Sequence, residues 1–145
     1  QQDRGYRGSL VNVVRHRLGV RFDCIAPAGF CLLSAIQIAA TVCQVDLMLT
    51  SGTDSHTLPD PHVTGEAYDV SVHLLSAQQI ANVKASLERT LGPWFTVLYE
   101  VPMRPSDPTL RPIAYINPHA TGPHFHLQRK KGTTFPPEPS TPSVT

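Results

Sequence analysis

The longest apolar stretch of the chain is the feature that most constrains its fold. It runs over residues 28–45, and its polar side chains recur at intervals of three, four and three: Ser34, Gln37, Thr41 and Gln44. This spacing places them in one stripe of an α-helix. At about 1.5 Å per residue, the stretch barely reaches across a hydrocarbon layer of about 30 Å. We therefore expect a core helix with a narrow polar face, and no membrane span.

Turn-forming and alternating residues predict the remaining elements. Strands are expected at residues 46–50, 67–73, 95–100, 113–117 and 124–128. A capping box of Ser76 and Gln79 opens a second helix, which Gly92 and Pro93 end. The order helix, strand, strand, helix and three strands is not a βαβ alternation. It predicts an α+β fold with a mostly antiparallel sheet flanked by helices.

Length and charge limit the organisation and the partners of the chain. Its 145 residues are enough for one domain, and its net charge is +1. No broad electrostatic field favours nucleic acid, so a partner must be held by a local site. We expect a monomer with a domain over residues 10–131 and a loose extension over 1–9. Residues 132–145, rich in Pro, Ser and Thr, are expected to form a flexible tail.

Three cysteines, Cys24, Cys31 and Cys43, are too few for a disulfide framework. If Cys31 and Cys43 share the first helix, they lie about 18 Å apart, which is beyond the reach of a disulfide. A bridge that involves Cys24 and a set of three buried thiols therefore both stay open.

The segment from His62 to Asp69 carries the pattern H-x-x-G-x-A-x-D. His62 ends a loop and Asp69 lies in a predicted strand, so the two side chains converge only if the chain reverses between them. Gly65 permits this reversal because glycine readily adopts a positive φ, and Ala67 is small enough to lie beneath a crowded site. Taken alone, His62 is typical of a loop residue. An Asp within a strand is disfavoured, however, and requires a reason.

The second pattern is His124-Phe125-His126 on a predicted strand. Alternate residues of a strand share a face. His124, His126 and Gln128 therefore face one way, and Phe125 and Leu127 face the other. Two His and one Asp provide the N,N,O ligand set of a catalytic zinc with an open fourth position. The alternative for the two histidines is a solvent-exposed strand face.

Together the two patterns resemble the zinc D-Ala-D-Ala carboxypeptidases and dipeptidases and the related L-alanyl-D-glutamate endolysins. These proteins have a hedgehog-type fold and cleave peptidoglycan stem peptides. Their pattern is S-x-H-x-x-G-x-A-x-D, followed by a ligand His in an E-x-x-H or H-x-H context. The resemblance covers about residues 28–128. It implies a Zn²⁺ cofactor held by His62, Asp69 and His126.

A zinc peptidase also needs a general base that takes a proton from water. His124 is the first candidate, because the strand places it beside His126. Glu100, on another predicted strand, is the second candidate, and His119 is the third.

Three positions depart from the family pattern. Asp60 replaces the Ser, Asp54 stands where an Arg usually follows the Ser-Gly turn, and Pro123 stands where the E-x-x-H branch has its Glu. The loss of the Arg weakens recognition of a free C-terminal carboxylate. An endopeptidase, or a protein that has lost activity, therefore gains weight beside a carboxypeptidase.

The sequence thus predicts a zinc metallopeptidase that hydrolyses peptide bonds of peptidoglycan stem or cross-link peptides. We expect it to be extracellular or periplasmic, either secreted or delivered by a phage. The alternative is a non-catalytic module of the same fold that binds cell wall or peptide, with or without metal. A third hypothesis is a structural metal protein. His56 is interpreted as a loop residue or an alternative ligand, and His73 as a surface residue.

Overall fold

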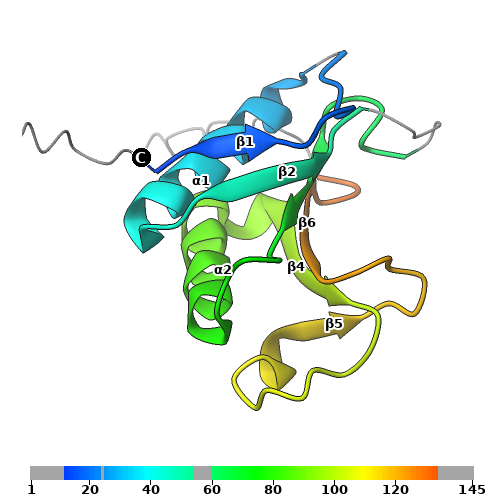
Figure 1. Cartoon of the computed structure of the whole chain (residues 1–145). Helices are drawn as coiled ribbons and strands as arrows, with labels where there is room; N and C mark the ends of the chain where they lie inside the picture. The colour runs from blue at the N-terminus through cyan, green and yellow to red at the C-terminus, as the bar shows by residue number, and fades with distance from the viewer. Residues whose placement is uncertain (1–11, 24, 54–59, 134–145) are drawn as a thin grey trace, which may run out of the picture.

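The structure is a computed structural model, and it describes residues 12–23, 25–53 and 60–133 (Figure 1). In chain order its helices and strands are β1 (Val14–His16), α1 (Pro27–Cys43), β2 (Leu47–Ser51), β3 (Ala67–Ser71), α2 (Ala77–Leu91), β4 (Phe95–Val101), β5 (Ala114–Ile116) and β6 (His124–Arg129). Short 3-10 helices, η1 (Gly92–Trp94) and η2 (Arg111–Ile113), precede β4 and β5. The predictions for residues 1–9, Cys24, Asp54, His56 and most of the tail lie outside the described residues.

The six strands form one mixed sheet in the order β1-β2-β3-β6-β4-β5. The pairs β2–β3, β3–β6 and β4–β6 are antiparallel, whereas β1–β2 and β4–β5 are parallel. The α+β class is confirmed, but the prediction of a mostly antiparallel sheet is wrong. The reason lies in two connections of a dozen residues or more, α1 after β1 and residues 102–113 after β4. Connections of that length permit a parallel crossover.

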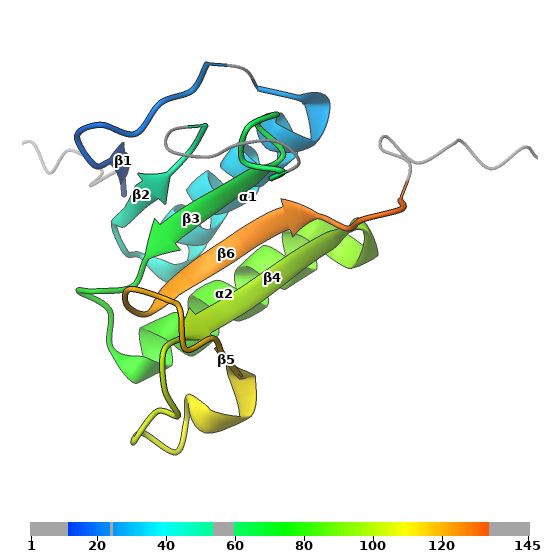
Figure 2. The ribbon, with the colours of Figure 1, turned by 90° about the vertical axis from the view of Figure 1, so that its right-hand side faces the viewer.

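Both helices pack on one face of the sheet, and Figure 2 shows the sheet in front of them. The predicted polar stripe of α1 is exposed, while Leu32, Ala35 and Ile36 are fully buried. The predicted capping box of α2 is confirmed: Ser76 Oγ accepts from Gln79 N at 3.2 Å, and Gln79 Oε1 accepts from Ser76 N at 2.8 Å. The helices therefore form where their periodicity and caps predict them.

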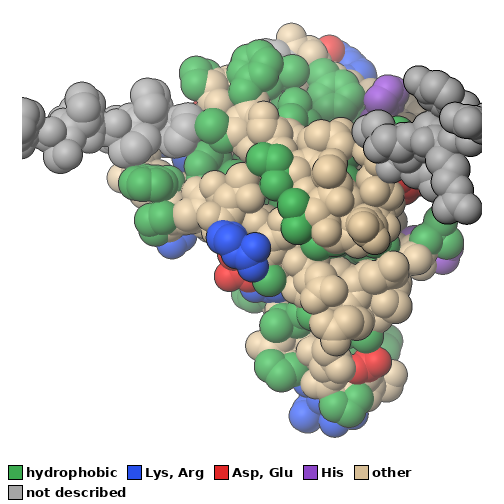
Figure 3. Space-filling model, turned by 90° about the vertical axis from the view of Figure 1, so that its left-hand side faces the viewer, with side chains coloured by type: hydrophobic (Ala, Val, Ile, Leu, Met, Phe, Trp, Pro, Cys, Tyr) green, Lys and Arg blue, Asp and Glu red, His purple; other side chains and the backbone are tan. Residues whose placement is uncertain are grey.

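Figure 3 shows the side opposite to Figure 2, which the helices cover, with hydrophobic side chains between polar ones. On α1, Phe30, Ile38 and Val42 are exposed. Within the described ranges, neither helix is long and apolar enough to cross a bilayer. Cys31 and Cys43 are free thiols.

The alternation along the central strands separates the core from the other face of the sheet. Toward the helices, Tyr68, Val70, Phe125 and Leu127 are fully buried. The alternate positions of β3, β4 and β6 point the opposite way. That second face carries the polar residues that the sequence singles out.

Candidate metal centre

His62 lies in a tight turn before β3, and only 3% of the residue is exposed. Asp60 Oδ1 accepts from His62 N at 2.9 Å, and Gly65 N donates to His62 O at 3.0 Å. Gly65 has a φ of 72°, which is the positive value that the predicted reversal requires. Asp and Ser side chains both accept backbone N–H groups in such turns. The replacement of the family's Ser by Asp60 therefore preserves this type of turn.

Asp69 and His126 face each other across β3 and β6. The two residues are register partners in this antiparallel pair. Phe125 and Leu127, the neighbours of His126 on β6, point into the core and have no exposed surface. The predicted alternation of β6 is thus confirmed, and His126 lies over a rigid apolar layer.

Three side chains, His62, Asp69 and His126, bring one potential ligand atom each within 4.8 Å of one another. Asp69 Oδ1 lies 3.6 Å from His62 Nε2 and 2.8 Å from His126 Nδ1. The centroids of the two imidazole rings are 5.2 Å apart. Residues that are far apart in the sequence therefore meet at one point, as the resemblance implies.

Hydrogen bonds on the outer side of each imidazole determine which nitrogen faces Asp69. His62 Nδ1 donates to the carbonyl oxygen of Gly52 at 3.2 Å, and His126 Nε2 donates to Gln128 Oε1 at 2.8 Å. The other nitrogen of each ring faces Asp69: His62 Nε2 and His126 Nδ1 lie 3.6 and 2.8 Å from its Oδ1. Outer acceptors of this kind orient the histidines that bind zinc in other proteins.

His126 has an oxygen acceptor at both ring nitrogens, because Asp69 lies on one side and Gln128 on the other. A neutral imidazole carries a single proton. When this proton lies on Nε2, a further proton or a metal ion is needed between His126 Nδ1 and Asp69. The donor set of two imidazole nitrogens and one carboxylate oxygen fits zinc.

The pKa values of this pair are shifted in opposite directions. Desolvation lowers the pKa of His126, but the hydrogen bonds with Asp69 and Gln128 and the nearby carboxylates outweigh it, so the pKa is raised. Desolvation raises the pKa of Asp69, but the hydrogen bond with His126 and the charges of the surrounding histidines outweigh it, so the pKa is lowered. Without a metal, these shifts favour an imidazolium at His126 and a carboxylate at Asp69.

The first two candidates for the general base lie beside this centre. His124 Nδ1 donates to Gly122 O at 2.9 Å, so in the neutral ring Nε2 is the acceptor nitrogen. This Nε2 lies 3.9 Å from Asp69 Oδ1 and 3.7 Å from Glu100 Oε1. Glu100 is the register partner of His124 on β4. A neighbouring strand therefore supplies a carboxylate, although Pro123 occupies the family's Glu position.

A single cavity of about 430 Å³ is lined by the three potential ligands, by His124 and Glu100, and by His119, the third candidate base.

Asn117 also lines this cavity, and the sequence patterns did not predict a role for it. No local signal identifies Asn117, because its partner Glu100 lies 17 positions away in the chain. Gln128 shares the predicted face of β6, but its bond to His126 became evident only from the side-chain positions.

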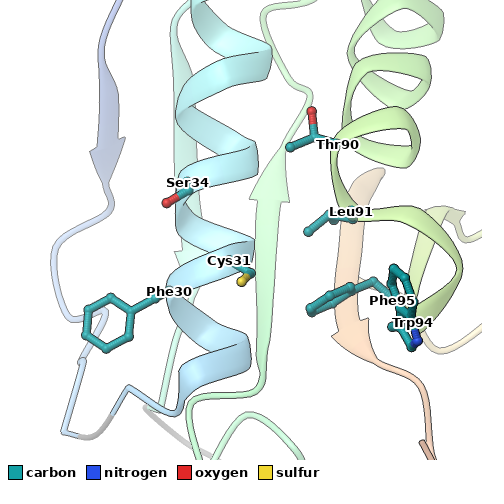
Figure 4. Close-up of a pocket in the computed structure, with 7 residues that line it drawn as sticks. All are labelled: Phe30, Cys31, Ser34, Thr90, Leu91, Trp94 and Phe95. Atoms are coloured by element: carbon teal, nitrogen blue, oxygen red, sulfur yellow. The ribbon is translucent and has the colours of Figure 1, made fainter. Parts of the chain in front are cut away.

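A second cavity, of about 400 Å³, lies on the helix side of the sheet (Figure 4). It is lined by Phe30, Cys31, Ser34, Thr90, Leu91, Trp94 and Phe95. Trp94 lies in η1, directly after α2, and is 39% exposed. No imidazole or carboxylate lines this cavity in the described part of the chain. The ligands and proton carriers lie in the first cavity.

His73 and Glu66 are polar residues outside the cavity lining. His73 is exposed on the surface, as predicted, and its N–H donates to Ser71 Oγ at 3.2 Å. Glu66 is partly buried and forms an ion pair with Arg129. A backbone hydrogen bond also joins Glu66 and Arg129: Arg129 N donates to Glu66 O at 3.1 Å.

The fold and the centre define an α+β protein with a mixed sheet, two helices on one face and a His-Asp-His cluster on the other. Comparisons with protein-family models, with curated proteins and with solved structures found no match. The function is therefore argued from the geometry of the centre together with the sequence patterns.

Proposed function

We propose that this protein is a zinc-dependent peptidase that hydrolyses peptide bonds of peptidoglycan stem or cross-link peptides. The observation that carries the proposal is that His62, Asp69 and His126 each offer one potential ligand atom, and that these three atoms lie within 4.8 Å of one another. The cluster lies at the wall of an open cavity, and a set of three protein ligands is typical of catalytic rather than structural zinc. The substrate class follows from the resemblance in sequence.

Zinc bound there supplies a Lewis acid for the scissile carbonyl and a water of lowered pKa. His124 acts as the general base, because its Nδ1 is occupied by the hydrogen bond to Gly122 O and the residue lines the cavity beside the centre. Glu100 and Asp69 lie 3.7 and 3.9 Å from this nitrogen, so they stabilise the imidazolium that forms. His124 then returns the proton to the leaving amine.

Charge in the cavity favours an endopeptidase over a carboxypeptidase. No Lys or Arg lines the cavity in the part of the chain that the structure describes. Asp54 stands at the family's Arg position, and the six residues 54–59 contain no basic side chain except His56. Within the described lining of the cavity, a terminal carboxylate would therefore meet no Lys or Arg side chain. Peptidoglycan lies outside the cytoplasm, so the protein would act there after secretion or phage delivery. We expect it to act as a monomer.

Metal analysis of the purified full chain tests the centre. We expect about one zinc per chain in the wild type, because the histidine nitrogens and the carboxylate form one site. His62→Ala and Asp69→Ala should lose the zinc, whereas His73→Ala, an exposed histidine outside the cavity, should keep it. Wild-type protein that binds no zinc, or variants that all bind it equally, would contradict the proposed ligand set.

Release of amines from purified peptidoglycan tests the reaction. Wild-type protein should release new amino groups, a chelator should stop the release, and added zinc should restore it. His124→Ala should lower turnover by roughly 10²–10⁴-fold and keep the zinc, because it removes the base and no ligand. Zinc binding without any release of amines would instead support the alternative function, a non-catalytic binding module.

A further inference from the structure

Asn117 follows β5 and connects three parts of the cavity wall. Its backbone N donates to Val101 O at 2.8 Å and extends the β4–β5 ladder. Its side-chain Nδ2 donates to Glu100 Oε1 at 2.7 Å, and its Oδ1 accepts from His119 N at 3.0 Å. The amide therefore uses both its donor and its acceptor, one on a strand and one on the following turn.

The bond from Asn117 determines how the Glu100 carboxylate is oriented. The Glu100 side chain is 14% exposed, and the same Oε1 that accepts from Asn117 lies 3.7 Å from His124 Nε2. Because Glu100 and His124 are register partners, the backbone fixes the distance between their strands. The rotation of the carboxylate is left to its side-chain partners. A neutral amide orients a carboxylate without neutralising its charge.

We propose that Asn117 is a positioning residue that holds the Glu100 carboxylate against His124. In this arrangement the Glu100 carboxylate keeps one orientation toward His124 Nε2, at 3.7 Å. Asn117 acts through Glu100 and not on the substrate. The kinetic consequence rests on the proposed function, whereas the effect on the His124 ring does not.

The variant Asn117→Asp distinguishes the orientation of Glu100 from support of the turn that contains His119. The substituted side chain keeps an oxygen for His119 N, and the backbone bond to Val101 is unaffected. It loses the donor to Glu100 and places a carboxylate there instead. Asn82→Asp is the matched control, since Asn82 lies on α2 and its Oδ1 accepts from Gln78 Nε2 at 2.9 Å, on the other side of the sheet.

Kinetics of the zinc-loaded chain on peptidoglycan test the coupling. Asn117→Asp should lower kcat by roughly 10–100-fold, with little change in KM and unchanged zinc content. In the Glu100→Gln background the same substitution should change kcat by less than about threefold, because the carboxylate it positions is gone. An equal loss in both backgrounds would overturn the proposal, as would a wild-type rate in Asn117→Asp.

Nitrogen NMR of the histidine rings gives a readout that needs no turnover. At one fixed pH, the ring resonances of His124 should shift in Asn117→Asp and stay in place in Asn82→Asp. Unchanged His124 resonances would overturn the positioning role, even in an active peptidase. A wild-type protein without turnover, but with the expected shift, would overturn the proposed function and leave the positioning role intact.

Discussion

At His126, two oxygen acceptors share a ring that carries one proton when it is neutral. Asp69 Oδ1 and Gln128 Oε1 each lie 2.8 Å from a ring nitrogen. The position between Nδ1 and Asp69 can therefore hold a proton in metal-free protein, and it would hold zinc in the proposed enzyme. Proton and metal compete for the same nitrogen. This competition gives the centre a pH dependence that stability measurements detect without a substrate.

In the presence of a chelator, Asp69→Asn should destabilise the protein most between about pH 4 and pH 6.5. The pKa of Asp69 is lowered from 3.8, so its contribution is present above that pH and lost as the pH falls through the folded-state pKa. The pKa of His126 is raised from 6.5, so its contribution is complete below that pH and lost as the pH rises through the folded-state pKa. Both contributions coincide only in this window.

Urea unfolding of wild type and Asp69→Asn from pH 3 to pH 9 measures this difference. A charged hydrogen bond contributes about 1–3 kcal/mol, which is the difference in unfolding free energy expected near pH 5. The difference should shrink toward both ends of the range. A difference that stays constant across the range would show that the pair is not ionised as described.

For single residues, the sequence patterns predicted which side chains form the candidate centre. They did not predict the side-chain hydrogen bonds that orient these residues. The spacing of His62 and Asp69 and the alternation around His126 are local properties of the chain. Gln128 and Asn117 take their roles from side-chain orientation and strand register. Asn117, for example, reaches Glu100 only because β5 pairs in parallel with β4.

Among the elements, α1 packs closely against the turn that carries His62. Gly29 of α1 is buried, and a Cβ added there would lie 2.1 Å from Gly65 O. Both sides of this contact are backbone, so no side chain can move aside to relieve it. Gly65 N in turn donates to His62 O at 3.0 Å. The helix therefore helps to set the position of a proposed ligand.

Gly29→Ala should therefore destabilise the protein and weaken zinc binding. Helix propensity alone would stabilise an alanine variant by about 1 kcal/mol. The backbone clash should outweigh this gain and leave a net loss of about 1–3 kcal/mol. Urea unfolding and zinc titration measure the two effects.

Gly122→Ala serves as the control, because nothing lies within 4 Å of a Cβ added at Gly122. It should change the unfolding free energy by less than about 0.5 kcal/mol. A Gly29→Ala variant that is more stable than wild type would show that α1 does not constrain the turn.

The helices were more predictable than the strand pairing. α1 and α2 were placed within about two residues of their observed ends, because periodicity and caps are local signals. β1 was missed, since it has three residues and the sequence Val-Arg-His shows no clear alternation. Parallel pairing of β1 with β2 depends on the path of α1 across the sheet, which no local pattern specifies.

In the whole molecule, the three proposed ligands come from segments that only the folded sheet brings together. His62 lies in the turn before β3, Asp69 lies on β3, and His126 lies on β6, 57 residues further along the chain. The ligands come together through the β3–β6 pairing and through the packing of α1 on the turn. Metal binding at this centre should therefore be coupled to folding of the entire sheet.

Zinc should raise the melting temperature of the wild-type protein. Binding to the native state alone stabilises it by about 2.7 kcal/mol when free zinc is 100 times Kd. For a chain of 145 residues, 1 kcal/mol corresponds to about 2–4 °C, so the rise should be about 5–11 °C. Magnesium at the same concentration should have little effect, because it prefers oxygen ligands and octahedral geometry. Thermal unfolding of chelator-treated protein with each metal added back measures the shift.

His62→Ala and Asp69→Ala should show a rise of less than about 2 °C, since each removes one of three ligands. An equal rise in these variants would locate the zinc elsewhere in the chain, and the proposed centre would then have no part in the stability that zinc confers.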